Sequence, residues 1–132
     1  MSKGTIKTNV RGEPEEPVDN LDALNLALER LAADNKSRPI VVDLVRNNGD
    51  SLSFGIGADL TALSFTPADG GACMASIGDP AVAAGPRQFI SGGHWTEVRS
   101  KHLIPMTLAV EEIRHWFQHG VLGLGPIKWR TC

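Results

Sequence analysis

Hydrophobic positions along the chain repeat with two different periods, and the changes between them predict the order of elements. Over residues 20–34, leucines recur at steps of three and four, which predicts a helix with one apolar face. Asp19 is the expected N-cap, Asp22 lies in the first turn, and Asn35 is the expected left-handed terminator. The leucines of the apolar face are Leu21, Leu24, Leu28 and Leu31.

A strict alternation of apolar and polar residues then predicts strands. Residues 40–45 follow Pro39 as a β-branched run, and residues 51–56 place Leu52, Phe54 and Ile56 on one face. The intervening residues 47–50 tolerate positive φ, so this is the clearest hairpin in the chain.

Two further pairs of strands and a second helix follow. Residues 62–66 and 72–77 flank a turn at 67–71, and residues 89–90 and 95–98 flank Gly92 and Gly93. A helix is expected from Pro105 to Gly120, and Trp129 is the inward residue of a short last strand. On that helix, the predicted apolar face holds Met106, Ala109, Val110, Ile113, Trp116 and Phe117, and the polar face holds Glu111, Glu112, His115 and His119.

This order of elements predicts an α+β fold. We expect an antiparallel sheet of about five to seven strands, with two helices packed on one face. Residues 18–132 are predicted to form a single domain after a flexible lead-in at 1–17, where prolines and glutamates cluster. A mass of 14.1 kDa suits one such domain.

Composition and charge exclude several classes of protein. Hydrophobic residues make up 42% and charged residues 21% of the chain, as in globular proteins. No apolar run approaches the roughly 18 residues of a membrane span, and no secretory signal is recognisable, so we expect a cytoplasmic protein without a membrane partner. Charge is uneven: residues 39–86 carry one arginine and five aspartates, whereas residues 87–132 carry six basic and three acidic residues. A bipolar molecule is therefore expected.

The two cysteines are Cys73 and Cys132. They could pair in an oxidising compartment, but reduced thiols are the expectation in the cytosol, so both are interpreted as structural or incidental.

The sequence offers little support for catalysis or for metal binding. Residues 55–59 lack the third glycine, the lysine and the following helix of a phosphate loop, so they are interpreted as a strand end. His115 and His119 supply only two of the three or four ligands that zinc needs, and no serine lies in a Gly-x-Ser-x-Gly turn. We therefore predict no catalytic residue, no cofactor and no metal site.

We also do not expect nucleic acid to be a partner. The last third of the chain holds three tryptophans, but six basic residues over 46 positions are few for a nucleic-acid surface. Trp116 falls on the apolar helix face, whereas Trp95 follows a glycine turn and is the better candidate for a protein interface.

Several landmarks together resemble one known family. The chain is similar, over residues 18–130, to the first-named family of immunity proteins of bacterial polymorphic toxin systems. The landmarks are the helix at 20–34, residues 39–42, Gly49, residues 52–57, residues 63–65, the glycine-rich middle, the helix after Ile104 and Pro105, and the closing Trp129.

This resemblance implies a function without catalysis. Such a protein is a stoichiometric inhibitor that forms a one-to-one complex with a cognate toxin, commonly a nucleic-acid deaminase, and occludes its active site. An acidic surface would suit a partner whose groove accepts nucleic acid. We therefore expect toxin binding by Asp59, Asp69 and Asp79, with Trp95 and Glu97 as additions.

Two other classes stay open. A small metabolite-binding or metal-binding enzyme domain would use the turns at 55–59 and 70–71, with a metal held by His94, His102 or Cys73. A nucleic-acid-binding module would use residues 87–130.

Overall fold

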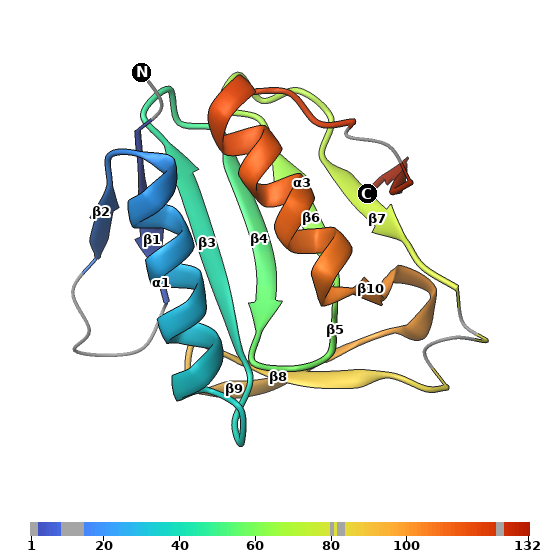
Figure 1. The fold of residues 1–132 in the computed structure, drawn as a ribbon. Helices are drawn as coiled ribbons and strands as arrows, with labels where there is room; N and C mark the ends of the chain where they lie inside the picture. Colours follow the sequence, from blue (N-terminus) through green and yellow to red (C-terminus); the bar gives the residue numbers. More distant parts are fainter. Residues whose placement is uncertain (1–2, 9–14, 80, 82–83, 124–125) are drawn as a thin grey trace.

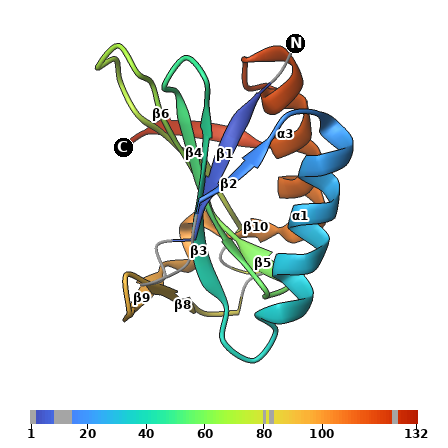
Figure 2. The same cartoon turned by 90° about the vertical axis from the view of Figure 1, so that its left-hand side faces the viewer.

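Two helices cover one face of a large sheet. The computed structural model describes residues 3–8, 15–79, 81, 84–123 and 126–132. Helices α1 (Leu21–Asp34) and α3 (Met106–His119) lie side by side on the same face (Figures 1 and 2). This arrangement confirms the predicted α+β class with the helices on one face.

Within the described residues the main sheet has nine strands, more than the five to seven expected. A mostly antiparallel path runs β11 (Lys128–Thr131), β7 (Met74–Ile77), β6 (Leu63–Thr66), β4 (Ser51–Ile56), β3 (Ile40–Arg46), β1 (Gly4–Lys7), β2 (Glu16–Val18). Strand β8 (Arg87–Ser91) joins β3 in parallel at Ile90 and Ile40, and β9 (His94–Val98) pairs with β8. A separate small sheet pairs β5 (Leu60–Thr61) with β10 (Ile104–Pro105), which follows the 3-10 turn η1 (Ser100–His102).

The three predicted pairs of strands are confirmed, and the extra strands come from the N-terminus. Strands β1 and β2 lie in residues assigned by the sequence to a lead-in, and Ile6 of β1 is buried in the core. The prediction was wrong for residues 4–7 and 16–17 because each strand is only three or four residues long, and Pro17 breaks any alternation in β2.

The helix ends differ in detail from their predictions. Asn20, not Asp19, caps α1, because its Oδ1 accepts a hydrogen bond from the Ala23 N–H at 2.8 Å. Asn35 has φ −120° and is not left-handed; its Nδ2 donates to the Leu31 carbonyl at 2.8 Å instead. Gly120 ends α3 in the left-handed conformation as predicted, whereas Pro105 precedes that helix as its N-cap.

One predicted polar residue of α3 belongs to the core. Glu112 is only 1% exposed, and its Oε1 accepts a hydrogen bond from the Gly123 N–H at 2.8 Å. Its position falls within the buried stripe 109, 112, 113, 116 and 117, which has helical spacing. The carboxylate therefore fastens the segment that follows α3 to the helix, and the assignment of Glu112 to the solvent face was wrong.

Replacing Glu112 by alanine should lower the free energy of unfolding by about 1–3 kcal/mol, because the partly buried hydrogen bond between its carboxylate and the Gly123 N–H is lost. Glu112→Gln keeps an oxygen at the same place and should cost less. Urea denaturation of the two variants measures the difference. Equal losses would show that the acceptor oxygen is not what stabilises this segment.

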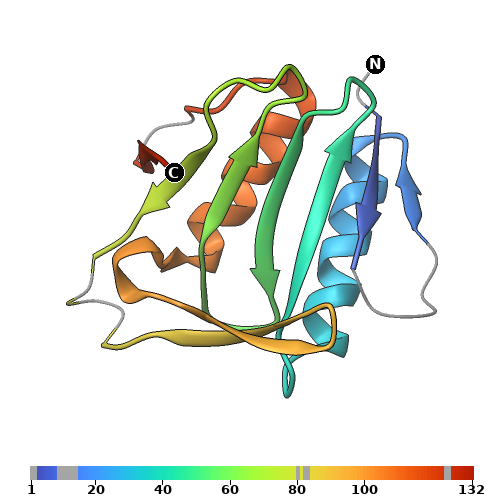
Figure 3. The same ribbon diagram turned by 180° about the vertical axis from the view of Figure 1, so that it is seen from behind.

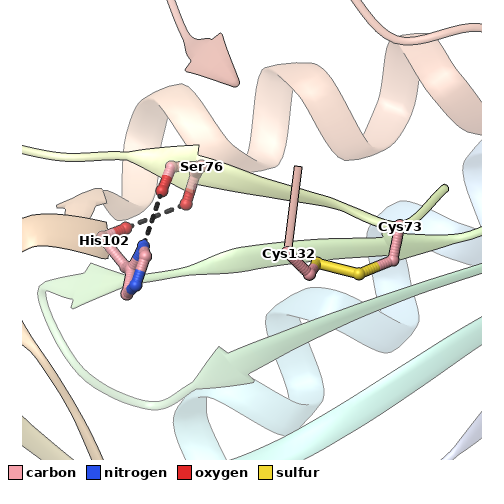
Figure 4. The surroundings of a disulfide bond; sticks show 4 residues. All are labelled: Cys73, Ser76, His102 and Cys132. Atoms are coloured by element: carbon pink, nitrogen blue, oxygen red, sulfur yellow. Dashed lines mark hydrogen bonds between the residues drawn. A yellow bond between two sulfur atoms is a disulfide. The ribbon is translucent and has the colours of Figure 1, made fainter. Parts of the chain in front are cut away.

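The cysteines form a disulfide that extends the pairing of β7 with β11 (Figure 4). Thr131 pairs with Met74, so the next residues outward are Cys132 and Cys73, and the Cys132 N–H donates to the Cys73 carbonyl at 3.1 Å. The Cα–Cα distance of 5.5 Å is the usual one for a disulfide. The expectation of reduced, unpaired thiols is corrected here; it failed because only the register of the last strand brings the two residues together.

Candidate protein-binding site

The β8–β9 hairpin is built around two glycines. Gly92 and Gly93 have φ of 58° and 85°, the signature of a two-residue type I′ turn, which suits the twist of the flanking strands. Ser91 and His94 are the pair that closes this turn, and pairing continues to Arg87 and Val98. The sequence around the turn therefore dictates a regular hairpin.

The hairpin crosses the face of the sheet opposite the helices, at the end where β3 begins (Figures 2 and 3). Phe89 is 1% exposed and packs on Gly55, where an added Cβ would overlap its ring. The Ile90 N–H donates to the Pro39 carbonyl at 2.8 Å. Gly55 is therefore the strand glycine that permits close approach, which supports the strand-end interpretation of residues 55–59.

The outer strand of the hairpin is exposed along most of its length. Residues 94–97 are all exposed, and Trp95 retains 54% of its accessible surface. Tryptophan is among the residues most enriched in the energetic centres of protein interfaces. The structure thus places Trp95 on the surface, beside Glu97, rather than in the core.

Asp59 forms an ion pair with Arg87 of the same hairpin. It follows β4, its side chain is 75% exposed, and its Oδ1 lies 3.5 Å from the Arg87 Nε. An ion pair this exposed contributes little stability, so the Asp59 carboxylate stays available to a partner. We call Asp59, Trp95 and Glu97 the hairpin patch.

This ion pair also corrects the expected bipolar molecule. Arg87 comes from the basic part of the chain and Asp59 from the acidic part, yet the two are neighbours. Likewise, Lys128 of β11 pairs with Ile77 in the acidic part. Folding therefore mixes the two charged segments in space.

The two remaining predicted residues lie in turns outside the hairpin. Asp79 is exposed in the segment after β7, and its Oδ1 accepts from the Ala81 N–H at 2.9 Å. Asp69 is exposed in the β6–β7 turn, and its Oδ1 accepts from the Gly71 N–H at 2.8 Å. Asp69 follows β6 near Ser51 at the start of β4, whereas Phe89 packs on Gly55 near the end of β4, a strand about 17 Å long.

Ser76 and His102, both drawn near the disulfide in Figure 4, contact each other through two hydrogen bonds. Ser76 Oγ donates to the His102 carbonyl at 2.8 Å, and His102 Nδ1 lies 3.1 Å from the Ser76 carbonyl oxygen (Figure 4). The histidine ring contacts the serine backbone and not its hydroxyl, so the pair is not a nucleophile with its base. These contacts join η1 to β7.

The described residues contain neither a cluster of metal-binding side chains nor a helix that could cross a bilayer. His115 and His119 have ring centroids 4.7 Å apart, but no cluster of three or more His, Cys, Asp or Glu side chains is found among the described residues. No helix in these residues is long and apolar enough to span a bilayer.

A comparison with known protein families identifies the family of this chain. A family model described as immunity protein Imm1 matches residues 12–130, nearly the whole chain. The chain belongs to the Imm1 family of immunity proteins. No match was found among curated proteins. Membership confirms the resemblance that the hydrophobic and glycine landmarks carried, and an immunity protein implies a cognate toxin as its partner.

Sequence reasoning missed two residues that position the Imm1 hairpin patch. Phe89 anchors the hairpin and Arg87 links it to Asp59. Gly55 lies between large strand residues, which indicated that another part of the chain packs closely against the strand there. The sequence did not indicate that this part is the Phe89 ring.

Proposed function

We propose that this Imm1 protein neutralises a nucleic-acid deaminase toxin by forming a one-to-one complex that closes the toxin's active site, without catalysis of its own. The family match over residues 12–130 is the observation that carries the proposal. We place the complex in the bacterial cytoplasm, where the toxin would otherwise reach nucleic acid.

Deaminase chemistry explains how binding alone can inhibit. Such an enzyme activates water on zinc inside a pocket that must admit a base flipped out of its stack, or a single strand. A protein that covers the entrance therefore abolishes turnover without contacting the metal. A groove that binds nucleic acid is also positively charged, so exposed carboxylates on the inhibitor complement it and speed association.

The hairpin patch supplies the centre of the proposed interface. Trp95 offers apolar area, Glu97 offers negative charge two residues along the same strand, and Asp59 adds negative charge at the Arg87 end of the hairpin. A standard interface buries about 800 Å² on each partner, a small share of the 7238 Å² surface of this chain. We keep Asp79 and Asp69 as outlying acidic contacts.

Removing the acidic charges should slow toxin association. Changing Asp59, Asp69 and Asp79 together to asparagine leaves an acceptor oxygen in each turn but removes three charges. We expect about a tenfold lower association rate at low salt and a shallower salt dependence, with Asp59→Asn giving the largest single effect. Stopped-flow mixing with the toxin at several ionic strengths measures both quantities.

Glu111→Gln is the matched control, because Glu111 is an exposed carboxylate on α3, in the helical layer. It should leave the association rate unchanged. Identical rates and salt slopes for the triple variant and the natural protein would rule out the acidic residues as toxin contacts.

A titration tests the proposed function. The purified toxin domain is assayed for deamination of cytosine-containing and adenine-containing single-stranded oligonucleotides while this protein is added in steps. We expect activity to fall linearly and to vanish at one equivalent. Full activity at several equivalents would contradict inhibition, and a toxin that deaminates neither base would contradict the deaminase assignment.

A further inference from the structure

The hydrogen bonding of the hairpin determines which backbone groups of β9 point outward. In a two-residue hairpin the closing pair, Ser91 and His94, is hydrogen-bonded, and bonded and non-bonded pairs then alternate. Ile90 and Trp95 are thus a non-bonded pair. The Ile90 N–H donates to Pro39, away from β9, which confirms this alternation independently.

Trp95 and Glu97 therefore direct their N–H and C=O groups to the free side of β9. In the described residues β9 pairs with β8 alone, so no strand occupies that side. The two residues of the hairpin patch that lie in β9, Trp95 and Glu97, therefore carry both exposed side chains and the outward backbone groups of the edge.

The other two edges of the main sheet are protected, whereas this one is not. Strand β2 has only three residues and contains Pro17. Strand β11 carries Lys128 and Arg130, and the disulfide links the residue after it to Cys73. Short edges, proline and lysine are devices that prevent strand addition. Strand β9 has five residues, His-Trp-Thr-Glu-Val, without proline or lysine. It is the sheet edge best suited to accept another strand.

We propose that an extended segment of the cognate toxin adds to β9 as a further antiparallel or parallel strand; this rests on the proposed function and specifies how the toxin docks. Trp95 and Glu97 project from one face of the hairpin two residues apart. The complementary segment carries an apolar or aromatic side chain beside Trp95 and a basic side chain beside Glu97.

A second copy of this chain is a poorer occupant of the edge. Within the five residues of β9, twofold-symmetric antiparallel pairing of two copies through the outward residues places Glu97 opposite Trp95 or opposite Glu97 of the other copy. Neither residue is basic, and the second pairing opposes two like charges. A segment of the toxin, in contrast, can place a basic side chain opposite Glu97.

A proline at position 97 tests the proposal. Glu97→Pro removes the outward N–H and blocks an added strand, but it removes no hydrogen bond to β8. We expect the Kd for the purified toxin domain to rise about 100-fold or more while the melting temperature shifts by only a few degrees. Glu97→Gln keeps the N–H and should raise the Kd less than about tenfold.

Amide hydrogen exchange supplies a readout on the natural protein that does not depend on the folding of any variant. The Trp95 and Glu97 amides should exchange fast in the free protein, and at least about 100-fold more slowly in the complex. Protection of neither amide in a tight complex, or a Kd for Glu97→Pro equal to that of the natural protein, would overturn strand addition and leave the immunity function standing. A β9-mediated dimer of the free protein would overturn the choice of occupant, and failure of the natural protein to bind the toxin would instead refute the proposed function.

Discussion

Replacing Phe89 by alanine should lower the free energy of unfolding by about 3–5 kcal/mol and weaken toxin binding as well. The ring is 1% exposed and fills the space above Gly55, so its removal leaves a cavity between the hairpin and the sheet. Because Phe89 is the buried side chain that packs the hairpin on the sheet, Trp95 and Glu97 then lose part of what fixes their position. Urea denaturation and a toxin-binding titration measure the two losses.

Gly55→Ala is the matched test of the same contact. Its new Cβ would overlap the Phe89 ring and should destabilise the protein on its own, yet it should cost much less when Phe89 is already alanine. Strictly additive losses in the double variant would show that Gly55 and Phe89 do not form the anchor.

Cys132→Ser should lower the free energy of unfolding by about 4 kcal/mol. The disulfide closes a loop with a sequence separation of 59, and the chain-entropy relation gives a cost of this size when the constraint is removed from the unfolded chain. For 132 residues this corresponds to a melting temperature about 10–15 °C lower. Thermal denaturation of the oxidised protein and of the variant measures it.

The double variant Cys73→Ser, Cys132→Ser serves as the control. It removes the same bond, so its melting temperature should be close to that of the single variant. Adding reductant should lower the melting temperature of the natural protein toward the values of the two variants. Two titratable thiols in the folded, air-oxidised protein, or a melting temperature insensitive to Cys132→Ser, would contradict the cross-link.

Local patterns predicted the centre of the fold well. The leucine spacing of α1 and the alternation of Leu52, Phe54 and Ile56 each reflect one buried face, and burial on one face is what periodicity records. Gly92 and Gly93 were predicted to separate two paired strands, and the structure gives both the positive φ that a type I′ turn requires.

Features that depend on distant partners were not predictable in this way. Glu112 shares the helical spacing of the buried stripe of α3, but its carboxylate is paired by the Gly123 N–H, and no local pattern records that contact. The disulfide depends on the register between β7 and β11. Strand β1 is a strand because β3 offers it an edge, and its four residues alone carry too short an alternation.

The candidate site was predictable in its residue types but not in its arrangement. Charge and an exposed aromatic indicated Asp59, Trp95 and Glu97 individually, and the structure associates them with one hairpin. Asp69 was grouped with them because it also occupies an acidic turn, yet alternate turns of an antiparallel sheet fall at opposite ends. Sequence spacing does not reveal which end a turn occupies.

Co-expression with the toxin encoded beside this chain's gene tests the proposed immunity function. Bacterial growth is followed with the toxin alone, with the toxin and this protein, and with the toxin and the Glu97→Pro variant, and any complex is isolated by pull-down and sized by gel filtration. We expect that the toxin alone arrests growth, that the natural protein restores it, and that a one-to-one complex is recovered. A toxin that arrests growth equally with and without this protein, with no complex recovered, would refute the immunity function.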